Sequence, residues 1–323
     1  MMKRFKDFIL ESNDYTMDYL TEDVMLLAEK LIMFNQGKKY GQVVFMAGGA
    51  GSGKGFASKN FMEVNKFKVR DVDEWKKAFM AMSTDKRFRE YGAVVYRDKK
   101  GKITAVDVDH EGGSIIKDRE DATGIRLGDL DLKNPEHVFI LHLAIKEMGI
   151  KHKTLDLLLS DLKQAYLPNI LFDVTLKEID DITDVLPTLL EVGYESRNIH
   201  IVWVLTNYHV AVRANKDRER VVPDDILLKT HEGAANTMYD LIKANGVPGL
   251  DGSVHVILNN RDQTIFWERP DGTKTDTVKG FTYLTLKKEG QKFYDQNEVN
   301  TQLLDWIKDN IPRTKQTAHM WGG

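Results

Sequence analysis

One short glycine-rich segment has the residue types and spacing that suit the binding of phosphate groups. Positions 48 to 54, with the sequence GGAGSGK, fit the pattern G-x-x-x-x-G-K. Glycines let the backbone wrap closely around phosphates with its N–H groups inward, and Lys54 would reach the terminal phosphates. An apolar run at Val43–Ala47 predicts a buried strand before the loop, and a helix at Lys54–Phe61 would add its positive end.

The loop and the start of the helix are therefore expected to hold the phosphates of a nucleotide. A glycine-rich turn with a chance lysine is the alternative, which the strand before and the helix after disfavour. The expected nucleotide-binding residues are Gly48, Gly49, Ala50, Gly51, Ser52, Gly53, Lys54, Gly55 and Phe56.

Gly55 stands where such loops normally carry a Ser or Thr that helps to hold magnesium. The order G-K-G also occurs in adenylate kinases, which this loop resembles locally. That resemblance implies a metal held largely through water and carboxylates. Gly55 is thus compatible with phosphoryl transfer and moves the binding of magnesium to acidic residues elsewhere in the chain.

A second segment, FKVRDVDEWKKAF at positions 67–79, places carboxylates at the end of a predicted strand. A carboxylate beside a phosphate loop can orient a hydroxyl and accept its proton. We predict Asp73 as this base, with Asp71 as the alternative, because a one-residue shift of the strand end would exchange them. Lys76 would face the phosphates one helical turn later. The alternative is a solvated helix start that carries favourable acidic residues.

A third segment, NILFDVTLKEID, ends an apolar strand with Asp173. Apolar residues followed by a carboxylate are typical of a strand end that holds magnesium or a water bound to it. Asp173 is therefore the predicted metal ligand, and Thr175 and Lys177 follow within reach of the same cleft as predicted substrate-binding residues. Capping of the next helix is the alternative role for Asp173.

Three arginines, Arg213, Arg218 and Arg220, follow the next predicted strand in a loop–helix segment. Arginines here could close over a transferring phosphate as a lid and stabilise developing charge. A solvated charged helix is the alternative. The order of the segments, after a phosphate loop and two acidic strand ends, favours the lid.

The elements that must position these residues alternate between strands and helices. This order predicts an α/β fold with a mostly parallel sheet covered on both faces, in which ligands bind beyond the carboxyl ends of the strands. Further strands are expected at Asn169–Val174, Asn198–Leu205 and Val254–Leu258, and further helices at 137–164, 182–192 and 223–244.

Three parts are expected along the chain. Residues 1–40 form a leader and a helix, residues 41–268 form the core, and residues 269–323 form a small α+β C-terminal extension with the strand FTYLTL and a helix near 297–308. The region near 80–135 is polar and contains two alternating β runs around a KKGK turn, which predicts a β-hairpin insertion into the core. A second hairpin is expected in NNRDQTIFWE, at positions 259–268.

Taken together, these segments resemble the zeta-toxin-like P-loop kinases, which are relatives of polynucleotide kinases. DVDEWK is similar to that family's D-x-D-x-aromatic-basic segment, and FDVTLKEID looks like its E-G-T-L-R segment. RERVVPDDILLKTH is similar to the arginine-rich lid, and VHVILNNRDQTIFWE resembles the last strand and hairpin. The resemblance covers about residues 41–268, apart from the insertion.

The resemblance implies ATP or GTP as donor, Mg²⁺, and a hydroxyl of a small molecule or nucleotide as acceptor. It implies Asp73 as base, Lys54 and the lid arginines as phosphate clamps, and Asp173 near the acceptor or metal. This sequence departs from the family at Gly55, at Asp173 in place of glutamate, at Val174 in place of glycine, and at Lys177 in place of arginine. A shorter carboxylate and a bulkier neighbour would reshape the acceptor pocket, so the family's amino-sugar nucleotide substrate is not carried over.

Two other functions stay open from the sequence. One is a polynucleotide 5′-kinase, because DVDEWK is also similar to the D-D-x-R motif of those enzymes. The net charge of −3 disfavours nucleic acid as a partner. A nucleotide-binding or virion-packaged protein without catalysis is the other alternative, consistent with Gly55 and the altered acidic segment.

Composition narrows the remaining possibilities. The chain has 323 residues and no cysteine, which excludes disulfides, thiolate catalysis and cysteine metal sites. We find no apolar run long enough to span a membrane, and we expect a cytoplasmic protein. The start, MMKRFKDFILES, resembles the short leader of proteins packaged into heads of large tailed bacteriophages, which implies phage origin in a bacterial host and possible packaging in the virion.

Overall fold

The structure is a computed structural model that describes residues 40–62, 67–71, 76–78, 80–81, 92–109, 122–159, 167–218, 221–260, 264–293 and 296–321. The leader and helix expected at residues 1–40 therefore lie outside the described residues, apart from Tyr40. Within the described part, no helix combines the length and apolar character needed to cross a lipid bilayer.

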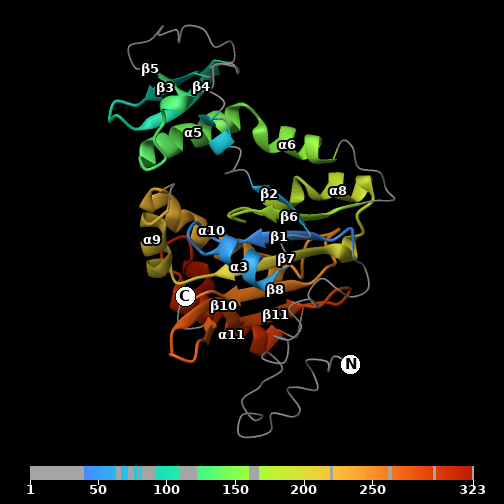
Figure 1. Ribbon diagram of the computed structural model, residues 1–323. Helices are drawn as coiled ribbons and strands as arrows, with labels where there is room; N and C mark the ends of the chain where they lie inside the picture. Colours follow the sequence, from blue (N-terminus) through green and yellow to red (C-terminus); the bar gives the residue numbers. More distant parts are fainter. Residues whose placement is uncertain are drawn as a thin grey trace, which may run out of the picture.

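The main sheet has six strands in the order β11-β8-β7-β1-β6-β2 (Figure 1). The strands β8, β7, β1, β6 and β2 run parallel to one another, and β11 is antiparallel to β8. Every residue of β1, β7 and β8 is buried, as expected for parallel strands covered on both faces. The strands span β1 (Val43–Ala47), β2 (Phe67–Asp71), β6 (Asn169–Asp173), β7 (Ile199–Leu205), β8 (Val254–Leu258) and β11 (Thr282–Lys287).

Two hydrophobic layers cover the sheet, and alternate residues of β1 contribute to each. Val44 and Met46 pack in one layer with Phe61 of α3. Phe45 packs in the other, which includes residues of α8, α10 and α11. The predicted α/β fold, a mostly parallel sheet flanked by helices, is confirmed. The helices of this core are α3 (Lys54–Phe61), α7 (Asp180–Thr183), α8 (Leu186–Val192), α9 (Tyr208–Lys216), α10 (Asp224–Lys243) and α11 (Gln296–Asn310), with the 3-10 turns η6 (Ser196–Asn198) and η7 (Ala318–Trp321).

The predicted hairpin insertion is present, and it is larger than a hairpin. Strands β3 (Gly92–Arg97) and β4 (Ile103–Asp109) pair antiparallel around a turn at Gly101, and β5 (Ala122–Arg126) pairs with the other edge of β3. The 3-10 turn η4 (Leu127–Asp129) and the helices α5 (Pro135–Glu147) and α6 (Ile150–Leu159) follow. Much of this part packs around a hydrophobic cluster of its own, beside the β2 edge of the main sheet (Figure 1).

The C-terminal region contains the second hairpin, but further along the chain than the sequence suggested. The expectation of a hairpin within 259–268 was wrong, because β9 (Ile265–Glu268) pairs with β10 (Lys274–Gly280). The turn between them forms where Asp271 Oδ1 accepts a hydrogen bond from Thr273 N at 2.9 Å and Gly272 has a φ of 80°. The strand β11 then joins the main sheet, so residues after 268 complete the core.

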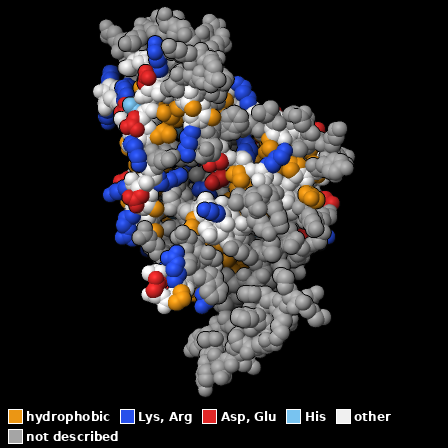
Figure 2. All heavy atoms as spheres, in the orientation of Figure 1, with side chains coloured by type: hydrophobic (Ala, Val, Ile, Leu, Met, Phe, Trp, Pro, Cys, Tyr) orange, Lys and Arg blue, Asp and Glu red, His pale blue; other side chains and the backbone are white. Residues whose placement is uncertain are grey.

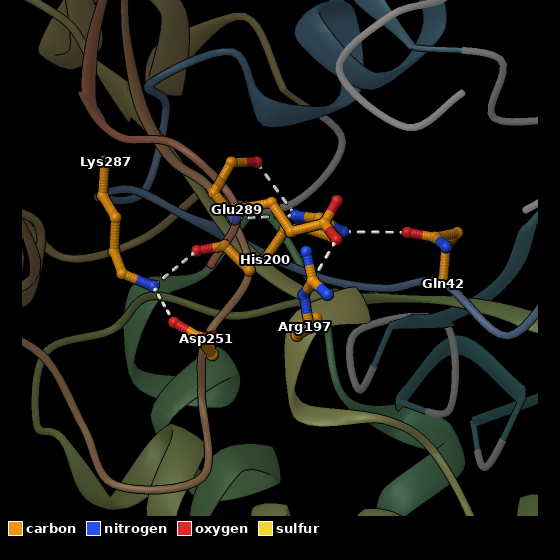
Figure 3. Close-up of polar contacts among 8 residues, drawn as sticks. Gln42, Arg197, His200, Asp251, Lys287 and Glu289 are labelled. Carbon is orange, nitrogen blue, oxygen red and sulfur yellow. Dashed lines mark hydrogen bonds and ion pairs between the residues drawn. The ribbon is translucent and has the colours of Figure 1, made fainter. Parts of the chain in front are cut away.

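A buried polar network lies at the amino ends of the strands, and Figure 3 shows how Gln42, His200, Asp251 and Lys287 lie in it. His200 Nε2 bonds Gln42 Oε1 at 2.8 Å, and its Nδ1 accepts from Ser253 N at 2.9 Å. Lys287 of β11 is also buried and donates to Asp251 Oδ1 at 2.8 Å. These bonds tie the edge strand to the β7–β8 connection, so we interpret the network as structural.

Buried neutral histidines make the fold sensitive to mild acid. Burial lowers the pKa of His200 to about 3 and the pKa values of His231 and His255 to about 4. Between the unfolded value near 6.5 and these folded values, the unfolded chain binds more protons. Stability is therefore full above pH 6.5 and falls by up to about 1.4 kcal/mol per pH unit for each histidine as the pH drops.

We expect the free energy of unfolding, measured by urea denaturation, to decrease from pH 7 to pH 5 with a slope that His200→Gln reduces. An unchanged slope in His200→Gln would contradict the assignment of a neutral buried imidazole.

Candidate active site

The glycine-rich loop joins β1 to α3 and follows the backbone path that its glycines require. Gly51 and Gly53 have φ values of 75° and 86°, in the left-handed region that favours glycine. A side chain at Gly51 would also come within 2.7 Å of the carbonyl oxygen of Ala211 in α9. The loop is thus shaped by its own sequence and by close contact with its neighbours.

Neighbouring elements hold the carbonyl groups of the loop from outside. Ala50 O accepts from His231 Nε2 at 2.8 Å, and Ser52 O accepts from Thr206 Oγ1 at 2.7 Å and Asn259 Nδ2 at 2.8 Å. The C=O and N–H of a trans peptide point in opposite directions. The N–H groups of the next residues, Gly51 and Gly53, therefore point away from these donors.

The start of α3 adds further unpaired donors. The first hydrogen bond of this helix runs from Ala57 N to Gly53 O at 2.9 Å. The N–H groups of Lys54, Gly55 and Phe56 come before it and have no acceptor within the helix. Together with the positive end of the helix dipole, they make the loop a site for anionic groups.

Lys54 lies between the loop and the predicted metal ligand. Its Nζ donates to Gly48 O at 2.8 Å and lies 3.5 Å from Asp173 Oδ1. Both side chains are partly buried, with 12% of the Lys54 side chain and 26% of the Asp173 side chain exposed. The sequence-predicted lysine and carboxylate are thus in contact.

Asp71 and Asp173 stand side by side at the ends of two parallel strands. They are register partners in the β2–β6 pair, so their side chains lie on the same face of the sheet. Figure 2 shows acidic side chains in the hollow between the insertion and the sheet, bordered by basic ones. Asp73, the predicted base, lies outside the described residues.

Asp71 and Asp173 are carboxylates of the kind that bind Mg²⁺ in nucleotide-dependent enzymes. No group of three or more His, Asp or Glu side chains in the described residues could hold a metal ion. One or two carboxylates suffice, however, when phosphates and water supply the other ligands. The loop contributes no hydroxyl at the usual position, because residue 55 is glycine.

The turn after β6 contacts the loop and then leaves it. Thr175 O accepts from Gly48 N at 3.3 Å, and Leu176, fully buried, has a φ of 51° that is rare for a leucine. After this turn Lys177 packs closely against Gly233 of α10, and its Nζ lies 3.3 Å from Glu178 Oε1. The backbone of Thr175 thus contacts the glycine-rich loop, whereas Lys177 packs against the surface of α10.

The predicted lid residues lie in and after α9. Arg213 and Arg218 are both exposed, and Arg220 lies outside the described residues. The segment is fixed at its ends, because Asn215 bonds the N–H and the C=O of Val222 at 3.0 and 2.7 Å. Arg218 O also accepts from Lys133 Nζ of the insertion, which connects the two parts. Lys76 is buried in the short helical segment 76–78.

Sequence reasoning missed four residues that support the loop: Thr206, Thr230, His231 and Asn259. Thr206 and Asn259 directly follow β7 and β8, so the rule that selected Asp173, a polar residue at a strand end, could have found them. Thr230 and His231 lie within α10, and no local signal marks them, because their role depends on the packing of that helix against the loop.

The glycines of the loop are expected to differ in their tolerance of a side chain. A Cβ at Gly49 would overlap the ring of His231, whereas one at Gly55 would meet nothing within 4 Å. We expect Gly49→Ala to lower the free energy of unfolding by about 1–3 kcal/mol. Gly55→Ala should leave it unchanged or raise it by up to about 1 kcal/mol. Urea denaturation checks both, and equal losses would contradict the described packing.

Comparison with known proteins gave matches among solved structures alone. No protein-family model matches the sequence, and the search of curated proteins found no match. A structure from work on the PezAT chromosomal toxin–antitoxin system of Streptococcus pneumoniae is 14% identical, covers 77% of this chain and 80% of its own, and has a TM-score of 0.37.

Structures of the AvrRxo1-ORF1:-ORF2 complex are also similar. The native complex is 12% identical, with 94% of this chain and 80% of the other covered and a TM-score of 0.42. The complex with ATP is 10% identical, with 93% and 79% covered and a TM-score of 0.38.

Proposed function

We propose that this protein is a P-loop kinase that transfers the terminal phosphoryl group of ATP or GTP to a hydroxyl of a small molecule or nucleotide. One observation carries the proposal: Lys54, at the start of α3, lies beside Asp173 at the mouth of a glycine loop whose carbonyl groups are bonded by neighbouring elements. Phosphoryl transfer depends mainly on such positioning and electrostatic stabilisation.

The donor would bind with its phosphates in the loop. The N–H groups of Gly51, Gly53 and the first residues of α3 would donate to phosphate oxygens. Lys54 would exchange its bond to Gly48 O for one to a terminal phosphate oxygen. The ammonium group would then offset the negative charge that spreads over the transferring group.

The acceptor would bind on the β6–β2 side, where the acidic strand ends lie. Asp173 would hold Mg²⁺ or its water, and the ion would neutralise charge on the phosphates when bound. Asp73 or Asp71 would accept the proton of the hydroxyl; the place of Asp71 beside Asp173 in the strand register supports it as a candidate. Lys76, Thr175 and Lys177 would border the acceptor, and Arg213, Arg218 and Arg220 would close over the phosphates.

Titration with ATP and GTP, in Mg²⁺ and in EDTA, tests the donor half of this proposal. We expect saturable binding of at least one nucleotide, and weaker binding when Mg²⁺ is removed. A protein that is folded by circular dichroism and binds neither nucleotide would contradict the proposed function.

A further inference from the structure

Side chains of α10 form hydrogen bonds with both the backbone N–H and the backbone C=O of one loop residue, Ala50. Thr230 Oγ1 accepts from Ala50 N at 3.0 Å and donates its own proton to Leu227 O at 2.7 Å. His231 Nε2 lies 2.8 Å from Ala50 O. A carbonyl oxygen can only accept, so His231 carries its proton on Nε2 and is the donor.

The environment of His231 keeps it in this form. Its side chain is 2% exposed, and burial lowers its pKa to about 4, so the ring is neutral at physiological pH. Tyr208 of α9 packs edge-on to the ring, with 6.0 Å between the centroids. The lack of a side chain at Gly49 gives the ring room to reach the loop.

Two adjacent residues of one helix thus fix the orientation of two successive peptide groups of the loop. The Ala50–Gly51 peptide has its carbonyl directed at His231, so the Gly51 N–H points away from α10. Without this bond, the peptide could rotate, and a partly buried carbonyl would lose its partner. The orientation of the donor amide is therefore imposed from outside the glycine pattern.

We propose that Thr230 and His231 are positioning residues of the donor site: His231 aims the Gly51 N–H at a phosphate oxygen of the nucleotide, and Thr230 holds the preceding Gly49–Ala50 peptide in place. This inference rests on the proposed function, since it needs a nucleotide in the loop. It assigns the role to the hydrogen-bonding groups of the pair and not to the bulk of the imidazole ring.

The test is ATP affinity, measured by isothermal titration calorimetry on wild type, His231→Leu, His231→Gln, Thr230→Val and Lys54→Ala. His231→Leu removes the donor, and His231→Gln retains an amide N–H near the position of Nε2. Thr230→Val keeps the shape of the side chain and provides a milder second variant. Thr183→Val is the control, because Thr183 also bonds a helix carbonyl, Ile179 O, in α7. Melting temperatures are recorded for every variant.

We expect His231→Leu to weaken ATP binding about tenfold, and Thr230→Val about threefold to tenfold, as for the loss of one oriented donor to a charged group. His231→Gln should recover most of the affinity, and Thr183→Val should bind as wild type does. Wild-type affinity in His231→Leu and Thr230→Val, with binding lost in Lys54→Ala, would overturn the positioning role alone. A His231→Gln protein that melts as wild type does but binds ATP as weakly as His231→Leu would also overturn it. Equal ATP binding by wild type and Lys54→Ala would instead overturn the proposed function, and the pair's role with it.

Discussion

Replacing Lys54 by alanine is expected to reduce phosphoryl transfer by about 100-fold to 1,000-fold, the loss typical of removing one group that stabilises the transition state. The ammonium group of Lys54 is the cation at the mouth of the loop that contacts both Gly48 O and Asp173. Its loss removes the charge that would offset the transferring phosphate. Transfer of label from γ-labelled ATP, with initial rates compared to wild type, measures the effect.

Lys59 provides the matched control for this substitution. It lies in the same helix and is exposed near the last turn of α3. Lys59→Ala should therefore transfer phosphate at the wild-type rate. A Lys54→Ala protein that keeps more than about a tenth of wild-type transfer would place the phosphate site elsewhere in the chain.

Replacing Asp173 by asparagine should reduce transfer by about 100-fold or more, because the change removes a charge that would hold Mg²⁺ while the shape is kept. The residual activity should need a higher Mg²⁺ concentration, which a titration of rate against Mg²⁺ would show. The fold should survive, because asparagine keeps the shape of the side chain and Lys54 keeps its bond to Gly48 O.

Asp180→Asn serves as the control for Asp173→Asn. Asp180 is an exposed carboxylate at the start of α7, away from the strand end. The Asp180→Asn substitution should change neither the rate of phosphoryl transfer nor its dependence on Mg²⁺. If Asp173→Asn retained the wild-type dependence on Mg²⁺, the metal would have to be held by other groups, with Asp71 as the first candidate.

The core of the fold could be predicted from sequence where local signals agree with each other. The strand Val43–Ala47 and the helix Lys54–Phe61 have the predicted bounds, because an apolar run and a glycine loop define them without help from distant residues. The helix expected at 182–192 is divided into α7 and α8, but it ends at residue 192 as expected, where Gly193 has a φ of 112°.

The elements that depend on tertiary pairing were harder to place. The sequence FTYLTL indicated a strand, but only the structure shows that it pairs antiparallel with β8. The partner of β9 was misplaced for the same reason, because pairing partners are selected by packing and turn geometry.

The candidate site divides in a similar way. Lys54 and Asp173 were found from sequence, because a glycine loop marks the first and the end of an apolar strand marks the second. His231 was not found, since its contact with Ala50 spans 181 positions and leaves no local pattern. The choice between Asp71 and Asp73 as base stays a prediction: Asp71 lies in register with Asp173, and Asp73 lies outside the described residues.

The most direct test of the proposed kinase is transfer of label from γ-labelled ATP in the presence of Mg²⁺. Wild type, Lys54→Ala and Asp173→Asn would be incubated alone, with pooled small-molecule metabolites and with nucleic acids. We predict that wild type labels a small molecule or nucleotide, and that both variants lose this transfer. Labelling of oligonucleotide 5′ ends would indicate a polynucleotide kinase instead. Nucleotide binding by wild type without transfer to any pool would contradict the account and favour a non-catalytic nucleotide-binding protein.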